Sequence, residues 1–366
     1  MANTPLLGYV VPGGITKRDE PAPLAFDFTV VKNPSEVSAR DLGDHFKNKR
    51  NTFSASLANF HDIYYQLDLY LGSDKQMNSV IIDTGSSDLF VPSTSFSPNT
   101  STTSHDTGTS YGARYIDGTI ARGEYYLDTL QFDSGVILSN FQFGVNHYSG
   151  LGILGLGNRE RETVHQKYDN LPWALHNAGV TPKASYSLYL DPDHGAGVVI
   201  FGGVDTAKYD GCLTKYPVHT PGQDLTINLE SIKVSGKEIT INSPYALDSG
   251  TSLGYLDQET MAEFDVLFNT TVVNQGGVEY RTTSCDQPSD QYVAFEFGAN
   301  TISVPYSDMV VDDGDGTCMF GFAYLDGKQI LGDVFLRKAY VYFDLSEQTI
   351  SLAQSAPGNA SNIVSV

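Results

Sequence analysis

Two short segments of this chain carry nearly the same sequence, and this repeat constrains the fold more than any other feature. The first reads Val80-Ile81-Ile82-Asp83-Thr84-Gly85-Ser86-Ser87, and the second reads Tyr245-Ala246-Leu247-Asp248-Ser249-Gly250-Thr251-Ser252. In each segment an apolar run ends in one aspartate, and a turn containing glycine and hydroxyl side chains follows. A buried aspartate is costly unless it is hydrogen-bonded. One such turn in each half of the chain predicts a duplicated scaffold that brings two carboxyl groups together.

The repeat continues beyond the two turns. An apolar segment ending in Gly155 follows the first turn, 72 residues after Asp83, and one ending in Gly332 follows the second, 84 residues after Asp248. Two adjacent carboxyl groups that share one proton are suited to acid–base hydrolysis. The pattern therefore predicts two related lobes, with Asp83 and Asp248 as the candidate catalytic pair.

The length and composition favour an all-β protein. At 366 residues the chain is long enough for two domains of ~150 residues each. Its 35 glycines, 22 tyrosines and many Ser and Thr residues fit short strands joined by turns. Alternating or continuous apolar patterns predict strands that begin at Ile63 and cover residues 78–84, 123–132, 136–146, 185–190 and 350–353. Helical signals are limited to residues 171–178 and 258–268.

The charge balance excludes two classes of partner. With 43 acidic and 22 basic residues, the net charge is −21, which repels nucleic acid and anionic membranes. The acidic surplus fits a solvated surface coat or adaptation to acid surroundings, and the two are compatible. No run of ~18 apolar residues predicts a membrane span. Residues 1–15 also lack the basic and apolar regions of an intact signal peptide.

The start of the chain has the pattern of a removable segment. Two dibasic pairs, Lys17-Arg18 and Lys49-Arg50, precede the first aspartate turn, and strand-like residues 24–31 lie between them. Dibasic pairs also occur on ordinary surfaces, but this arrangement predicts a prosegment trimmed after Arg50. The expected organisation is a prosegment (1–50), an N-terminal lobe with Asp83 (51–203) and a C-terminal lobe with Asp248 (204–366).

The three cysteines and three glycosylation sequons indicate the cellular compartment in which the protein folds. Cys285 and Cys318 are close enough in sequence to close one modest loop, which leaves Cys212 as a packed or free thiol. Sequons begin at Asn99, Asn269 and Asn359. Both features favour an oxidising, secretory environment, although two or three sequons arise by chance in so Ser- and Thr-rich a chain.

These motifs resemble those of pepsin-type aspartic endopeptidases, and they are most similar to the secreted candidapepsins of yeasts. The likeness covers about residues 64–354, including the two aspartate turns and the Gly152-Ile153-Leu154-Gly155 and Ile330-Leu331-Gly332-Asp333 segments. It implies a bilobal pepsin-like fold of two β-barrel-like lobes with a few short helices. It also implies that Asp83 and Asp248 activate a water molecule. The residues that the resemblance assigns to supporting the pair are Thr84, Gly85, Ser86, Ser249, Gly250 and Thr251.

The resemblance further implies a flap that covers the cleft and closes on the substrate. The residues assigned to the flap and to substrate binding are Tyr115, Ile116, Asp117, Gly118, Ile81, Ile153 and Ser252. Asp-Gly is a favoured pair at the tip of a tight hairpin. Apolar residues among them predict a preference for bulky hydrophobic side chains at the scissile bond. The chain departs from the family in having Phe90 where a tryptophan is common, and in the cysteine-free loop at residues 92–107.

The implied enzyme needs no metal and no organic cofactor. It acts on protein and peptide substrates, is inhibited by pepstatin-like compounds, binds its own prosegment and works as a secreted, extracellular monomer. Cys285 and Cys318 match the disulfide that the family keeps in its second lobe. Two alternatives stay open: a yapsin-like processing protease for basic sites, and a catalytically inactive relative that serves as a binding protein.

Overall fold

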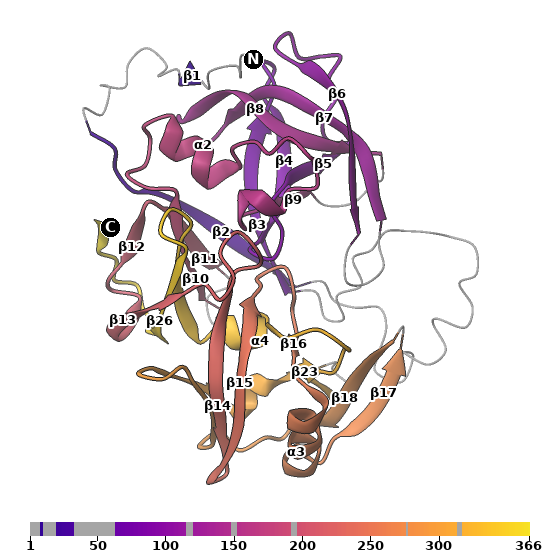
Figure 1. Cartoon of the computed structure of the whole chain (residues 1–366), viewed down its shortest axis with the longest axis vertical. Helices are drawn as coiled ribbons and strands as arrows, with labels where there is room; N and C mark the ends of the chain where they lie inside the picture. The colour runs from indigo at the N-terminus through magenta and orange to yellow at the C-terminus, as the bar shows by residue number, and fades with distance from the viewer. Residues whose placement is uncertain are drawn as a thin grey trace.

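The computed structural model describes residues 8–9, 20–32, 63–114, 120–147, 152–191, 196–275, 277–312 and 317–366. These residues form two lobes built mostly from β-strands, with the first aspartate turn in one lobe and the second in the other (Figure 1). The all-β, bilobal class predicted from the sequence is confirmed. Among the described residues, no helix has the length and apolar character needed to cross a membrane.

The largest sheet has 14 strands and runs from the first lobe into the region between the lobes. In spatial order its strands are β13 (Tyr209–Pro217), β26 (Thr349–Ser355), β25 (Ala339–Asp344), β10 (Ser185–Asp191), β11 (Ala196–Phe201), β2 (Leu24–Lys32), β3 (Ile63–Leu71), β4 (Gln76–Asp83), β9 (Gly152–Gly155), β5 (Leu89–Pro92), β8 (Ile137–Asn146), β7 (Ile120–Gln131) and β6 (His105–Arg114), with β1 (Gly8–Tyr9) pairing on β8. Strands from both ends of the chain meet in this sheet, so it joins the two lobes.

The second lobe contains two further sheets. One has seven strands: β20 (Thr301–Pro305), β19 (Tyr292–Glu296), β14 (Thr226–Val234), β15 (Lys237–Leu247), β24 (Ile330–Leu331), β16 (Gly254–Tyr255) and β23 (Phe322–Ala323). The other has four: β17 (Thr271–Gln275), β18 (Val278–Ser284), β22 (Thr317–Phe320) and β21 (Val310–Asp312). A separate two-stranded pair consists of β12 (Gly203–Asp205) and β27 (Ile363–Ser365).

The strand pairing confirms the internal repeat. In the first lobe β4 lies parallel to β9, with Asp83 opposite Gly155, and β9 lies antiparallel to β5. In the second lobe β15 lies parallel to β24, with Leu247 opposite Leu331, and β24 lies antiparallel to β16. In each half, the strand that leads to the aspartate therefore pairs with the short apolar strand at the corresponding glycine of the same half, Gly155 or Gly332. The same local arrangement positions both turns.

The few helices begin and end at recognisable signals. The helix α2 (Leu171–Asn177) has proline in its first turn and is followed by Gly179 at φ +71°, a conformation that glycine adopts without steric cost. The helix α3 (Gln258–Phe268) is capped by the Asp257 side chain, which accepts a hydrogen bond from the Thr260 N–H at 2.9 Å. Both helices were expected from the sequence. The remaining helical segments are η1 (Arg159–Arg161), η2 (Tyr306–Met309) and α4 (Asp333–Leu336).

The strand expected within the prosegment is an integral part of the large sheet. β2 pairs on one side with β11 and on the other with β3. Phe28 of β2 is buried, and its ring packs against the Tyr65 ring with centroids 5.4 Å apart. The dibasic pairs Lys17-Arg18 and Lys49-Arg50 lie outside the described residues.

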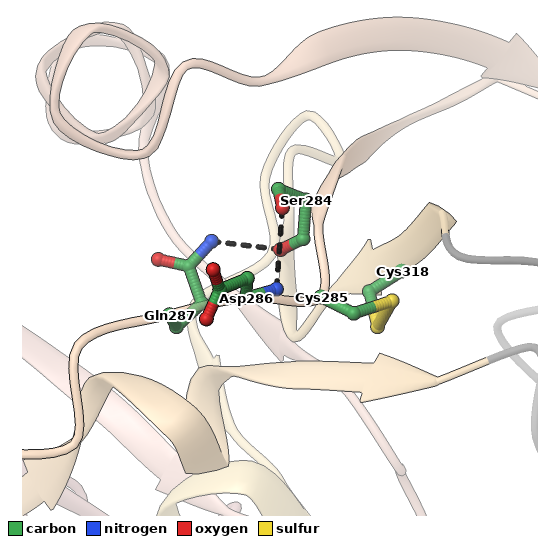
Figure 2. Close-up of a disulfide and its surroundings, with 5 residues drawn as sticks. All are labelled: Ser284, Cys285, Asp286, Gln287 and Cys318. Atoms are coloured by element: carbon green, nitrogen blue, oxygen red, sulfur yellow. Dashed lines mark hydrogen bonds between the residues drawn. A yellow bond between two sulfur atoms is a disulfide. The ribbon is translucent and has the colours of Figure 1, made fainter.

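The three cysteines are arranged as one disulfide and one free thiol. Cys285 and Cys318 are bonded, with their Cα atoms 4.9 Å apart. Figure 2 shows the bridge where the chain leaves β18, beside a turn in which Ser284 accepts hydrogen bonds from the Asp286 N–H and the Gln287 side chain. Cys212 is free and exposed, as one of the two expected alternatives, and it lies in strand β13. Gly211, at φ +74°, and a register shift against β26 account for the turn-like sequence within this strand.

Candidate active site

The two aspartates occupy equivalent positions at the ends of buried strands. Asp83 is the last residue of β4, Asp248 directly follows β15, and each side chain is only 7% exposed. The N–H of Gly85 donates to Asp83 Oδ1 at 2.8 Å, and the N–H of Gly250 donates to Asp248 Oδ1 at 2.9 Å. The apolar residues before each aspartate bury the strand, and the turn then supplies the hydrogen bonds that a buried carboxylate needs.

A hydroxyl group binds the second oxygen of each carboxylate. Ser86 donates to Asp83 Oδ2, and Thr251 donates to Asp248 Oδ2 at 2.7 Å. Both donors lie three residues after their aspartate, so the two turns have the same hydrogen-bond pattern. This pattern holds both carboxyl groups in a defined orientation.

The two carboxyl groups face each other closely across the boundary between the lobes. A Cβ atom built on Gly85 would lie 2.6 Å from the carboxyl carbon of Asp248, and one built on Gly250 would lie 2.4 Å from Asp83 Oδ1. No real side chain tolerates such distances. Glycine is therefore required in each turn because the carboxyl group of the opposite lobe occupies the space of a side chain.

Thr84 and Ser249 link the two turns directly. Thr84 Oγ1 donates to the Leu247 carbonyl at 2.7 Å and accepts from the Ser249 N–H at 3.0 Å. Reciprocally, Ser249 Oγ donates to the Ile82 carbonyl at 2.8 Å and accepts from the Thr84 N–H at 3.2 Å. Both side chains are buried. These four bonds set the relative position of the two lobes at the carboxyl pair.

The environment of the pair favours a shared proton. The pKa of Asp83 is raised to about 7, first by burial and then by the negative charge of Asp248, while the hydrogen bonds from Ser86 and Gly85 oppose this rise. Two carboxylates in contact cannot both ionise readily, so one proton is retained by the pair. A third buried carboxyl group, Asp333, has a pKa raised well above its usual range by burial, with Arg337 opposing and Asp248 adding to the shift.

A buried polar network lies behind the first turn. Asp88 is 5% exposed and accepts hydrogen bonds from the hydroxyls of Tyr125 at 2.8 Å and Tyr168 at 2.7 Å, and from the Thr163 N–H at 2.9 Å. Sequence analysis did not single out this network. The signal was an aspartate directly before the apolar residues Leu89 to Val91, since a buried charge requires partners.

Glu162 is a second buried carboxyl group in this region. Its side chain is 3% exposed and accepts a hydrogen bond from the Tyr168 N–H at 2.9 Å. Burial raises the pKa of Glu162 to about 9; the hydrogen bond from Tyr168 lowers it, and the charge of Asp88 raises it. Glu162 is therefore neutral in the folded protein at neutral pH.

Asn158 connects the first turn with the second lobe. Its carbonyl accepts from Ser87 Oγ at 2.6 Å, and its side-chain amide donates to the Gln223 carbonyl at 2.6 Å. Its side-chain oxygen accepts from Gln348 Nε2 at 2.7 Å. Asn158 is 1% exposed, and its bond with Ser87 is buried, whereas the bonds to Gln223 and Gln348 are partly buried. The sequence offered no motif that would have identified this bridge.

A cavity of about 560 Å³ opens between the lobes beside the carboxyl pair. Residues of both lobes line it, including Asp83, Asp248, Tyr111, Tyr255 and Tyr280. Arg161 and Asp224 also line it and form an ion pair of 2.8 Å that spans the two lobes. The cavity has the size and polarity of a cleft that holds an extended chain against the carboxyl pair.

The residues expected to bind substrate are only partly placed by the structure. Ile81 and Ile153 are buried in a cluster with Phe90, Tyr111 and Tyr125. Of this cluster, Tyr111 reaches the cavity, whereas Ile81, Ile153 and also Ser252 are not among the described residues that line it. The expected flap residues Tyr115, Ile116, Asp117 and Gly118 lie outside the described residues. The strands on either side, β6 and β7, pair antiparallel up to Arg114 opposite Ile120.

Two related lobes, each delivering a carboxyl group to a shared cleft, define the class of protein. The model of the eukaryotic aspartyl protease family matches residues 64–355, and the chain belongs to this family. It is an aspartic-type endopeptidase.

Among individual proteins, the chain is similar to candidapepsins. It is 35% identical to Candidapepsin of Candida tropicalis over 380 residues, which covers 97% of this chain and 94% of the relative. It is 37% identical to Secreted aspartic protease 1 of Candida albicans over 376 residues, which covers 94% of each protein. Secreted aspartic protease 8 of Candida albicans is 35% identical over 394 residues, with 97% of this chain and 94% of the relative covered.

Proposed function

We propose that the protein is a secreted endopeptidase that hydrolyses peptide bonds at acidic pH through Asp83 and Asp248. One observation carries this proposal: two buried carboxyl groups in matching turns approach so closely that glycine is required opposite each of them. Relatives named as secreted aspartic proteases support the secretion.

The chemistry follows from one proton shared by the pair, which is the general behaviour of the carboxyl pair in aspartic proteases. The ionised carboxylate removes a proton from a water molecule, whose oxygen attacks the carbonyl carbon of the scissile bond. The protonated carboxyl group donates its hydrogen bond, and then its proton, to the carbonyl oxygen. Collapse of the tetrahedral intermediate breaks the C–N bond: the carboxyl group that took the proton from water passes it to the leaving amine, and the other carboxylate takes a proton back from a hydroxyl of the intermediate as the C=O bond re-forms. Asp83 and Asp248 exchange roles in each cycle, so neither is permanently the acid.

The pH range of activity follows from the same pair. Activity requires that one proton remain on Asp83 and Asp248 together. Because the pKa of Asp83 is raised, we expect the pair to keep this proton through the acidic range and to lose it, with activity, as the pH rises through neutrality.

We further propose that residues 1–50 form a prosegment that is cut after Arg50, leaving lobes of residues 51–203 and 204–366. Support comes from the dibasic pairs Lys17-Arg18 and Lys49-Arg50, which flank strand β2 in the sequence. After such a cut, non-covalent contacts would hold the segment; among the described residues these include the pairing of β2 with β3 and β11, the pairing of β1 with β8, and the packing of Phe28 against Tyr65. The prosegment is then one partner of the enzyme, alongside protein substrates and pepstatin-like inhibitors, and the enzyme acts as a monomer.

The substrate preference is proposed to be for bulky hydrophobic side chains beside the scissile bond. The aromatic residues Tyr111, Tyr255 and Tyr280 in the cleft support this preference. Ile81, Ile153, Ser252 and the flap residues remain the predicted contacts.

Digestion of a denatured protein at acid pH, with and without pepstatin, tests the proposal. We expect pepstatin-sensitive cleavage that Asp83→Asn and Asp248→Asn each reduce by at least ~10²–10⁴. The exposed Asp290→Asn variant is the matched control and should retain full activity. Pepstatin-insensitive cleavage, or activity that survives in either active-site variant, would overturn the assignment. Parallel digests of a Phe-Leu peptide and a paired Lys/Arg peptide test the preference, which fails if only the basic peptide is cut.

A further inference from the structure

Asn269 begins the sequon Asn269-Thr270-Thr271, and the structure places it on the surface at the end of α3. It is the C-cap residue of this helix, in the left-handed conformation with φ 48° and ψ 50°, and it is exposed. Thr270 is held in place because its N–H and hydroxyl both donate to Asp265, at 3.2 and 2.5 Å. Thr271 is exposed. Both the acceptor residue and the third residue of the sequon are therefore exposed, beside a turn that Asp265 anchors.

Two exposed valines flank this sequon. Val266, three residues before Asn269, is 80% exposed, and Val272, three residues after it, is 43% exposed. Single exposed apolar residues are common on protein surfaces. Here Val266 lies in the last turn of α3 and Val272 is the second residue of β17, so exposed apolar side chains flank the two-residue connection that contains Asn269.

The strand that follows is an unprotected sheet edge. Within the described residues, β17 pairs only with β18 and is the outer strand of its four-stranded sheet, as Figure 1 shows at the periphery of the second lobe. Its sequence, Thr271-Val-Val-Asn-Gln275, contains no charge and no proline. Edge strands are ordinarily shielded by charges, proline, bulges or a covering segment. This edge has neither charge nor proline, and it begins at the sequon.

We propose that Asn269 carries an N-linked glycan that covers Val266, Val272 and the exposed edge of β17. In this modification the side-chain amide nitrogen of Asn269 bonds to the anomeric carbon of a lipid-linked oligosaccharide, and the lipid diphosphate leaves while the amide loses one proton. A bulky, hydrophilic glycan at this position would solubilise the surface around it. The inference rests on the proposed secretion, because the donor oligosaccharide is met in the secretory pathway.

The other two sequons provide an internal comparison. Their third-position hydroxyls are used in bonds to distant residues: Ser101 Oγ accepts from the Ser73 N–H at 3.0 Å, and Ser361 Oγ donates to Asp205 Oδ2 at 2.7 Å. Peptide mapping reports on all three asparagines in one measurement.

The experiment uses the full chain with Asp83→Asn, which prevents self-cleavage, expressed behind a secretion signal in yeast. Thr271→Ala destroys the sequon but keeps Asn269 and its left-handed cap, whereas the matched control Thr271→Ser keeps the sequon. Treatment with peptide N-glycosidase converts each glycosylated asparagine to aspartate, which mass spectrometry locates. We expect conversion at position 269 in the parent and in Thr271→Ser, and its complete loss in Thr271→Ala. An unmodified Asn269 in the secreted parent would overturn the proposal.

The proposed covering of Val266, Val272 and the β17 edge by the glycan is tested by a separate measurement. Light scattering should show that Thr271→Ala aggregates several-fold faster than Thr271→Ser at the same concentration, and that adding Val266→Thr and Val272→Thr to Thr271→Ala reverses this. Equal aggregation of Thr271→Ala and Thr271→Ser would refute shielding. Acid proteolysis by the active chain is scored separately, so a glycosylated protein without pepstatin-sensitive activity would contradict only the proposed function.

Discussion

Replacing Glu162 with glutamine should remove a large part of the pH dependence of this protein's stability. Glu162 is 3% exposed, and its pKa is raised to about 9, mainly by burial. The unfolded chain has an ordinary glutamate pKa of ~4.3. Because the folded pKa is the higher one, the stabilisation is fully present below the unfolded pKa and is lost as the pH rises through the folded pKa.

The size of the expected change in the free energy of unfolding follows from the titration of one proton. Between the two pKa values the folded state holds one proton more than the unfolded state, so the free energy of unfolding falls by ~1.4 kcal/mol per pH unit. From pH 5 to pH 8 the parent should therefore lose ~4 kcal/mol through Glu162. Glutamine resembles the neutral carboxyl group in shape and can still accept the hydrogen bond from the Tyr168 N–H. It carries no titrating proton, so Glu162→Gln should be close to the parent at pH 5 and ~4 kcal/mol more stable at pH 8.

Urea unfolding at pH 5, 6, 7 and 8 measures this difference. Both proteins should carry Asp83→Asn, because this change prevents self-digestion and removes another carboxyl group with a raised pKa, and Asp333 is common to both proteins. The matched control is Glu259→Gln, since Glu259 is exposed in the first turn of α3. Its unfolding free energy should parallel that of the parent across the range.

Two results would refute the reasoning. If the unfolding free energies of Glu162→Gln and the parent run parallel from pH 5 to pH 8, Glu162 does not retain its proton in the folded state. If the glutamine variant is destabilised equally at every pH, the carboxyl group contributes through packing and hydrogen bonding and not through its titration.

Three further changes test the contacts between the lobes and the disulfide within the second lobe. Thr84→Val leaves the Leu247 carbonyl and the Ser249 N–H without their buried hydroxyl partner. Urea unfolding should show that the free energy of unfolding falls by ~1–3 kcal/mol. An unchanged unfolding midpoint would contradict a role for these bonds in coupling the lobes. Asn158→Ala removes both side-chain hydrogen bonds to the second lobe, and the free energy of unfolding in urea should fall by a similar ~1–3 kcal/mol. An unchanged free energy of unfolding would show that these bonds are dispensable. Joint replacement of Cys285 and Cys318 by serine opens a loop with a sequence separation of 33 and should lower the unfolding free energy by ~2–4 kcal/mol, whereas adding reductant to that variant should have no further effect.

Much of the fold could be predicted from local patterns in the sequence. The apolar runs before Asp83 and Asp248 and their turns of glycine and hydroxyls indicated buried strands ending at hydrogen-bonded aspartates. Apolar patterns located several strands of the 14-stranded sheet, including β3, β4, β7 and β8, and the pattern of residues 171–178 located α2. These features depend on residues close together in the chain, so the sequence alone determines them.

Other properties depend on which distant segments pack together, and only the tertiary structure decides them. The pKa of Glu162 follows from its exclusion from water, and the partners of Asp88 come from positions up to 80 residues away. Asn158 bonds to Gln223 and Gln348, 65 and 190 residues away. Desolvation and long-range hydrogen bonds have no periodic signature in a sequence, because they arise only when folding removes water from particular pairs of side chains. The sequence alone determined which carboxyl groups stand at the two turns; folding decided how closely they meet and which buried neighbours hold them there.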